Sequence, residues 1–188
     1  MTPQLPRRGN VLVALGTNCS GPWGTPRQTL TRALAELARA GVAVRAVSSV
    51  YATAAIGQTR QPPYLNAVAL VETAMPPAAL LRLLKQIERG AGRRGGRPWG
   101  TRTLDLDLVD YKGLVQNWRP GRPRRPATVP GDHRPLVLPH PLMQERPFVL
   151  KPLLDVAPGW RHPVLRLSGR QLWERVATKA QGRVLRRL

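Results

Sequence analysis

The chain has 188 residues, and its 30 lysine and arginine residues against 10 aspartate and glutamate residues give a formal net charge of +20. Its 42% hydrophobic content excludes a disordered chain, and no apolar run reaches the roughly 20 residues that a membrane span needs. The single cysteine, Cys19, excludes an internal disulfide framework, and the apolar stretch after the N-terminus is too short for a signal peptide. We therefore predict one cytoplasmic domain over residues 1–188, with no membrane partner.

The first part of the chain alternates apolar strands with an amphipathic helix. Residues 11–16, VLVALG, form a β-branched apolar run that predicts a buried strand. Thr25 and Pro26 are typical of a helix N-cap and first turn, and apolar residues at helical spacing follow until Gly41. Residues 42–51 alternate apolar and polar side chains, which predicts one further strand.

The middle of the chain completes a recognisable order of elements. Residues 64–73 predict a strand, residues 76–89 a helix opened by two prolines, and residues 104–111 another strand. The order strand, helix, strand, strand, helix, strand is that of the ferredoxin-like α+β fold. This βαββαβ arrangement places helices on one face of an antiparallel sheet and leaves the other face free for a site.

The last third of the chain departs from this rhythm. Residues 115–134 are rich in arginine and proline, a composition that predicts an extended, solvated insertion. Residues 168–176 predict a short helix with a serine N-cap, and the basic tail, residues 179–188, is expected to fray. We expect a core over about residues 10–160 with a C-terminal extension.

Asp105 and Asp107 stand out because acidic residues are so scarce in this chain. In the alternating strand their side chains share one face, with Cβ atoms roughly 7 Å apart. Two such carboxylates form a hard-oxygen site for Mg²⁺ that substrate phosphates would complete, although a solvated strand face is the plainer alternative. The metal interpretation is favoured by four arginines in and beside the glycine-rich loop before the strand: Arg93, Arg94, Arg97 and Arg102.

Several motifs in order resemble those of one enzyme family. Residues 99–107, WGTRTLDLD, resemble the WGPRTLDLD signature of the 6-hydroxymethyl-7,8-dihydropterin pyrophosphokinases. Six further motifs match: ALGTN at 14–18, SSVYAT at 48–53, QPPYLNA at 61–67, E-x3-GR at 88–93, PH-x2-M-x2-R-x-F at 139–148, and PL with a closing AP at 152–158. The resemblance spans about residues 10–160 and is broken only by the insertion.

The resemblance implies transfer of a pyrophosphoryl group from ATP to the 6-hydroxymethyl group of a dihydropterin, giving AMP, in folate biosynthesis. It implies that Asp105 and Asp107 bind two Mg²⁺ ions that bridge the ATP phosphates and the attacking hydroxyl. It also implies that Arg93 and Arg102 pair with the phosphates, so that these four residues form the catalytic set. ATP and a dihydropterin are then the expected partners of a monomeric enzyme.

The other implied contacts fall into two sets. The family's ATP contacts, besides Arg93 and Arg102, correspond to Glu88, His140 and Arg146. The pterin contacts correspond to Thr53, Tyr64, Asn66, Trp99 and Phe148. Asn66 would read the pterin amide edge, Tyr64 and Phe148 would sandwich the ring, and Trp99 would close the lid.

Departures from the family pattern leave room for other functions. Thr101 replaces a usual proline, and Ala54 and Ala55 replace prolines near the pterin side. These changes permit a paralogue with altered pterin specificity. The strong positive charge also fits a basic nucleic-acid-binding protein, which is disfavoured because the chain has one phenylalanine and no aromatic run on a central strand.

Overall fold

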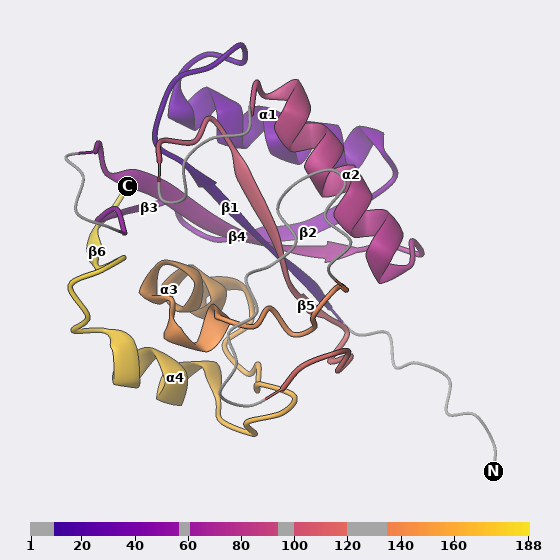
Figure 1. The fold of residues 1–188 in the computed structure, drawn as a ribbon, viewed down its shortest axis with the longest axis vertical. Coiled ribbons are helices and arrows are strands. Elements are labelled where there is room, and N and C mark those ends of the chain that lie inside the picture. Colours follow the sequence, from indigo (N-terminus) through magenta and orange to yellow (C-terminus); the bar gives the residue numbers. More distant parts are fainter. Residues whose placement is uncertain (1–9, 57–60, 94–99, 120–134) are drawn as a thin grey trace.

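The computed structural model describes residues 10–56, 61–93, 100–119 and 135–188. Figure 1 shows the elements, which run in chain order as β1 (Val11–Thr17), α1 (Pro26–Arg39), β2 (Ala43–Val47), β3 (Tyr51–Thr53), β4 (Tyr64–Glu72), α2 (Pro77–Gly90), β5 (Asp105–Tyr111), a 3₁₀ turn η1 (Met143–Glu145), α3 (Pro147–Val156), α4 (Gly169–Val176) and β6 (Val184–Arg187). The order of strands and helices expected for the core is confirmed.

The strands form one antiparallel sheet in the order β5-β1-β4-β3-β6, and β2 also pairs with β4. β1 and β4 lie in the middle, which explains their nearly continuous apolar sequences: side chains on both faces are covered. β5 lies at one edge and β6 at the other.

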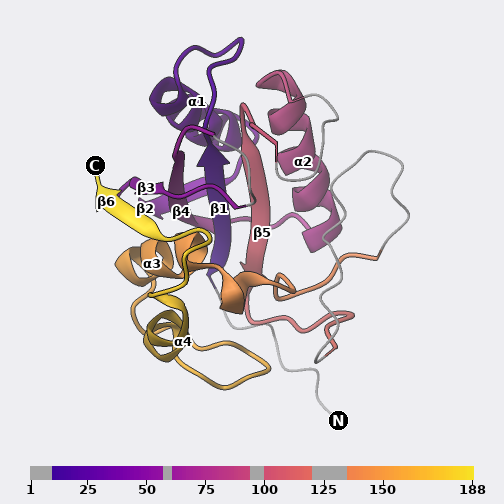
Figure 2. The same cartoon turned by 60° about the vertical axis from the view of Figure 1, so that its left-hand side comes forward.

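One face of the sheet packs against α1 and α2 (Figure 2). α1 begins in a capping box, in which the Thr25 hydroxyl accepts from the backbone N–H of Gln28 and the Gln28 side chain accepts from the backbone N–H of Thr25. Its buried stripe includes Leu30 and Leu37, which contact the face of β1 that carries Leu15. This layer is the larger of the two hydrophobic clusters.

The opposite face is partly covered by α3 and α4 (Figure 1). Leu12, Val68 and Val109 come from three different strands and pack with Leu150 of α3 and Leu172 of α4. The ferredoxin-like α+β fold is confirmed, but the free face is narrower than expected. Only the half of that face not covered by the C-terminal helices remains open.

Two local predictions differ from the structure. The expected single strand over 42–51 is two strands, because Ser48 uses its side chain and backbone to pair with Val68 of β4 and the chain turns there. The tail expected to fray forms β6 on β3, and the backbone N–H of Leu188 donates to Val50 at 2.9 Å. Most of the arginine and proline insertion, residues 120–134, lies outside the described residues, and no described helix has the length and apolar character to span a membrane.

Candidate active site

The strand registers bring the predicted site residues into rows on the open half of the sheet. Asp105 on β5 lies opposite Gly16 on β1, and Gly16 lies opposite Asn66 on β4. Asp107 lies opposite Ala14 in the next row. A Cβ at Gly16 would come within 2.9 Å of the Asn66 side-chain oxygen, so only glycine fits this floor position without displacing Asn66.

A cavity of about 710 Å³, counted to its open mouth, lies over these rows. The lining residues come from five parts of the chain: Ala14, Leu15, Gly16, Thr53, Ala54, Ile56, Tyr64, Asn66, Arg102, Asp105, Asp107, Arg146 and Phe148. Eight of them are residues that the family motifs single out for a role.

Each aspartate has its own cationic partner. The Arg93 guanidinium lies 2.6 Å from Asp105 Oδ1, and that of Arg102 lies 3.5 Å from the same oxygen. Arg146 lies 3.1 Å from Asp107 Oδ2. The side chains of Arg93 and Arg146 are only 12% and 15% exposed, so these contacts are largely shielded from water.

Electrostatics set the two carboxylates apart. Burial and the charge of Asp107 raise the pKa of Asp105. Burial also opposes ionisation of Asp107, but the surrounding positive charges win and lower its pKa below the usual range. His140 is neutral near pH 7, because burial and the charge of Arg146 lower its pKa to about 3. With His140 neutral, Lys85 and Arg146 are therefore the cations that contribute most to holding Asp107 ionised at neutral pH.

Two hydrogen bonds hold the polar side chains of Asn66 and Tyr64 in the cavity wall. Asn66 donates from Nδ2 to the Thr53 hydroxyl at 2.8 Å, which sets the orientation of its amide. The Tyr64 hydroxyl donates to the carbonyl of Gly100 at 2.8 Å. Burial, reinforced by the charge of Asp105, raises the pKa of Tyr64 to about 12, so this hydroxyl stays protonated and able to donate.

Glu88 lies behind β5 and does not line the cavity. Its side chain is 3% exposed, and Oε1 accepts from the backbone N–H of Leu106 at 2.7 Å and from Lys85 at 2.7 Å. It also forms an ion pair with Arg93. Burial raises the pKa of Glu88 to about 7, and the charges of Lys85 and Arg93 counteract part of this rise.

A second hollow adjoins the first. It is lined by Leu81, Lys85, Asp107, Leu108, Leu136, Val137, His140 and Pro141. Asp107 lines both hollows, which therefore meet at this carboxylate. His140 is held in place by its backbone N–H, which donates to the carbonyl of Val109 at 2.8 Å.

Residues 12–158 match the profile of a family described as 7,8-dihydro-6-hydroxymethylpterin-pyrophosphokinase (HPPK). The chain is 38% identical over 157 residues to a 2-amino-4-hydroxy-6-hydroxymethyldihydropteridine pyrophosphokinase of Synechocystis sp., covering 81% of this chain and 68% of the relative. It is 36% identical over 168 residues to the enzyme of that name from Pseudomonas aeruginosa, covering 89% of this chain and 90% of the relative.

This chain belongs to the HPPK family. The family resemblance and the pyrophosphokinase class expected from the sequence motifs are thereby confirmed. The Plasmodium falciparum HPPK-DHPS structure with the A437G substitution has the same fold, with a TM-score of 0.66 at 12% identity. The match covers 94% of this chain but only 44% of the Plasmodium chain.

Most residues predicted from HPPK motifs meet in one place. The first cavity contains Thr53, Tyr64, Asn66, Arg102, Asp105, Asp107, Arg146 and Phe148, and His140 lines the adjoining hollow. Arg93 contacts Asp105 directly, whereas Glu88 faces away from both hollows. Trp99, Arg94 and Arg97 lie outside the described residues.

Two site residues of this HPPK chain were missed as functional by sequence reasoning. Asn18 accepts from the backbone N–H of Arg102 at 2.8 Å through its side chain, so it fixes the segment that carries this arginine. Its place in the ALGTN motif was the available signal. Lys85 donates to Glu88 and to the carbonyl of Leu106 at 2.9 Å, and only its position three residues before Glu88 hinted at this pairing.

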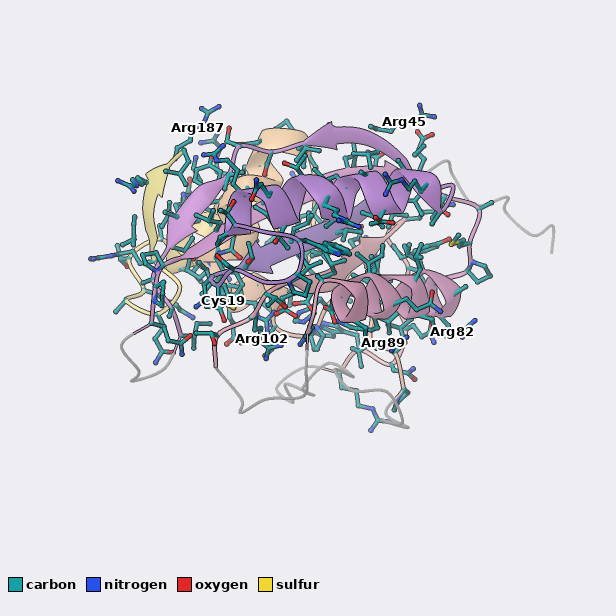
Figure 3. All side chains as sticks on the ribbon, turned by 90° about the horizontal axis from the view of Figure 1, so that it is seen from above. Cys19, Arg45, Arg82, Arg89, Arg102 and Arg187 are labelled. Atoms are coloured by element: carbon teal, nitrogen blue, oxygen red, sulfur yellow. The ribbon has the colours of Figure 1, made fainter. Side chains whose placement is uncertain are left out.

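Several arginines of this HPPK chain, among the described residues, lie away from the site. Arg45, Arg82 and Arg89 extend outward from β2 and α2, and Arg187 lies on β6 at the other end of the molecule (Figure 3). Arg102 lies nearer the middle and lines the cavity. Within the described ranges, only three arginines line the cavity or pair with Asp105 or Asp107: Arg93, Arg102 and Arg146.

Proposed function

We propose that the chain catalyses the Mg²⁺-dependent transfer of pyrophosphate from ATP to 6-hydroxymethyl-7,8-dihydropterin, giving the pterin diphosphate and AMP. The observation that carries this proposal is the position of Asp107, which lines both hollows. A phosphate chain that links the occupants of the two hollows would pass over the paired carboxylates. That geometry suits direct transfer between two substrates held at once.

The first cavity suits the pterin. Phe148 and Tyr64 supply aromatic surface for a flat ring, and the Asn66 amide, oriented by Thr53, supplies hydrogen bonds to the ring edge. Asn66 is 6% exposed, so its polar atoms would be costly to leave unpaired. These features support the assignment of all four residues to the pterin side.

The adjoining hollow suits the nucleotide. Leu81 and Leu136 provide apolar walls, and His140 adds a neutral polar group beside Asp107. Arg146 contacts both Asp107, at 3.1 Å, and His140, at 3.4 Å, and can also pair with phosphate oxygens. The deep burial of Glu88 supports an indirect role, in which it positions Arg93 for the nucleotide phosphates rather than touching ATP itself.

The residues present fit a magnesium site that depends on substrate. No group of three or more His, Cys, Asp or Glu side chains in the described ranges could hold an ion, so Asp105 and Asp107 would need phosphate oxygens to complete the shell. We propose two ions at this pair. Bound Mg²⁺ would supply neutralisation of phosphate charge.

The arginines supply the protein's own share of this neutralisation. Arg93 pairs with Asp105 at 2.6 Å and would turn to the phosphates when a metal takes that oxygen, while Arg102 already faces the cavity. The hydroxyl oxygen of the pterin would then bond to the β-phosphorus and release its proton to solvent. The bond from that phosphorus to the bridging oxygen of the α-phosphate breaks, and AMP leaves with this oxygen.

We also propose that residues 1–188 act as one domain, because one cavity gathers residues from Ala14 to Phe148, and that the chain is a monomer. The use of one cysteine, Cys19, supports a reducing compartment such as the cytoplasm.

The proposal is tested by measuring AMP formation from ATP and 6-hydroxymethyl-7,8-dihydropterin with Mg²⁺. We expect activity in the wild-type chain, none in Asp107→Ala, and full activity in Glu72→Ala, which alters an exposed carboxylate paired with Arg45. Activity in Asp107→Ala at the wild-type level would contradict the metal assignment. Salt-sensitive RNA binding without any pterin binding would favour the nucleic-acid-binding alternative instead.

A further inference from the structure

The C-terminal segment, residues 180–188, lies beyond the part of the chain that matches the family, which ends at residue 158. It returns to the pterin side of the cavity as β6. Val184 lies opposite Thr53 in the ladder, and the backbone N–H of Ala54 donates to the carbonyl of Arg183 at 2.9 Å. Thr53 and Ala54 both line the cavity, so this segment supports one of its walls.

Gly182 contacts the opposite wall. It is buried, has a φ of +70°, and an added Cβ would lie 2.7 Å from Cδ1 and 3.2 Å from Cε1 of Phe148. Such distances are far below normal contact, so the backbone of Gly182 already rests against the edge of the Phe148 ring. The ring cannot shift toward the C-terminal segment without a collision.

The segment is held mainly by polar contacts. Leu185 and Leu188 are 45% and 43% exposed, so hydrophobic burial contributes little to its attachment. The Arg187 Nε donates to the Ser49 hydroxyl at 2.7 Å, in addition to the β-ladder. β6 is fixed through its backbone and contributes little to the hydrophobic core. It is therefore suited to setting the distance between Thr53 and Phe148 rather than to stabilising the fold.

We propose that residues 182–184 are positioning residues for the pterin, because they fix the gap between the Thr53 wall and the Phe148 ring. This inference rests on the proposed function and assigns a further part of the chain to it. Thr53 orients the Asn66 amide through a 2.8 Å hydrogen bond, and Phe148 supplies stacking surface. The pterin ring can hydrogen-bond to the Asn66 amide at its edge and stack on Phe148 with its face only when these two side chains are held at the correct separation.

The test compares Gly182→Ala with Gly41→Ala. Gly41 has a φ of +79° and nothing within 4 Å of an added Cβ, so both variants carry the same backbone strain and only Gly182→Ala collides with a cavity residue. We expect Gly182→Ala to raise the pterin Kd, and the KM for pterin, about tenfold, equivalent to about 1.4 kcal/mol. The Kd of a non-hydrolysable ATP analogue and kcat at saturating pterin should stay within about twofold of those of Gly41→Ala.

A double variant tests the route of the effect. In a Phe148→Ala background the atoms that collide are gone, so adding Gly182→Ala should leave the pterin Kd unchanged. Equal pterin Kd values for Gly182→Ala and Gly41→Ala would overturn the proposal, and so would an equal weakening of the ATP analogue. If the wild-type chain bound no pterin, the proposed function itself would fail, which is a distinguishable result.

Discussion

The Glu88 carboxylate accepts a 2.7 Å hydrogen bond from the backbone N–H of Leu106, the residue between Asp105 and Asp107. β5 is an edge strand, so this N–H has no neighbouring strand to pair with. Lys85 donates to the carbonyl of Leu106 at 2.9 Å and completes the pairing. One turn of α2 therefore takes the place of a neighbouring strand at the residue between Asp105 and Asp107.

Glu88→Ala should lower the free energy of unfolding by about 3 kcal/mol, because it removes the acceptor of the buried Leu106 N–H and the partner of Lys85 and Arg93. Urea denaturation measures the loss. Glu36→Ala, at a partly exposed carboxylate on α1, is the matched control and should cost less than about 1 kcal/mol. Equal losses in the two variants would contradict this account.

Asp105→Asn should reduce the number of bound divalent ions. Electron paramagnetic resonance of Mn²⁺, titrated in the presence of a non-hydrolysable ATP analogue, should show two bound ions in the wild-type chain and one or none in the variant. The physical reason is that the amide lacks the charge with which a carboxylate holds a hard cation. Glu72→Gln, at an exposed acid, should bind as the wild type does. An unchanged stoichiometry in Asp105→Asn would remove this residue from the metal site.

Thr53→Val should weaken pterin binding about tenfold, which corresponds to about 1.4 kcal/mol. Valine keeps the shape of threonine but removes the acceptor for Asn66 Nδ2, so the buried amide loses its 2.8 Å partner and its fixed orientation. Calorimetry with the pterin measures the change. Thr31→Val, on the exposed face of α1, should leave pterin binding unaltered. A Thr53→Val variant that binds pterin normally would show that the amide is oriented by something else.

The parts of the fold that sequence predicted correctly are those whose signal is local. The strict alternation from Leu104 to Leu108 places Asp105 and Asp107 on the same face of the strand, whichever strands it pairs with. In the structure both aspartates lie on one face of β5 and line the same cavity. Helix α1 carries its own cap and stripe within 15 residues, from Thr25 to Arg39. The motif spacing then identified the cavity residues that these elements bring together.

The missed parts depend on contacts between distant segments. The tail that forms β6 was expected to fray because its sequence is basic. Its partner strand β3 lies more than 130 residues earlier, so no local pattern reveals the pairing. Helix α3 contains Pro152, a residue that argues against a helix interior unless tertiary packing on the sheet supports it. The burial of Glu88 likewise follows from α2 lying along the edge of β5, which no local pattern in the helix reveals.

His162 is fully buried between two aromatic rings outside the active site. Its Nδ1 accepts from the backbone N–H groups of Val164 and Leu165 at 3.2 and 3.1 Å. The rings of Trp118 and Trp160 pack edge-on against it, with centroids 5.6 and 5.8 Å away. Protonation of Nδ1 would set its N–H against the two backbone N–H groups that donate to it, so the ring is held neutral. Burial lowers the pKa of His162 to about 4.

The wild-type chain should therefore lose stability as the pH falls from about 6.5 to about 4. Unfolded His162 has an ordinary pKa near 6.5 and takes up its proton first, so protonation pulls the equilibrium toward the unfolded chain by up to about 3 kcal/mol. His162→Asn keeps an acceptor near the Nδ1 position and does not titrate there, so its free energy of unfolding should fall less over this range. Urea denaturation at pH 7, 5.5 and 4.5 gives the difference between the two chains, in which the contribution of His140 cancels. Parallel pH profiles would show that His162 titrates normally in the folded protein.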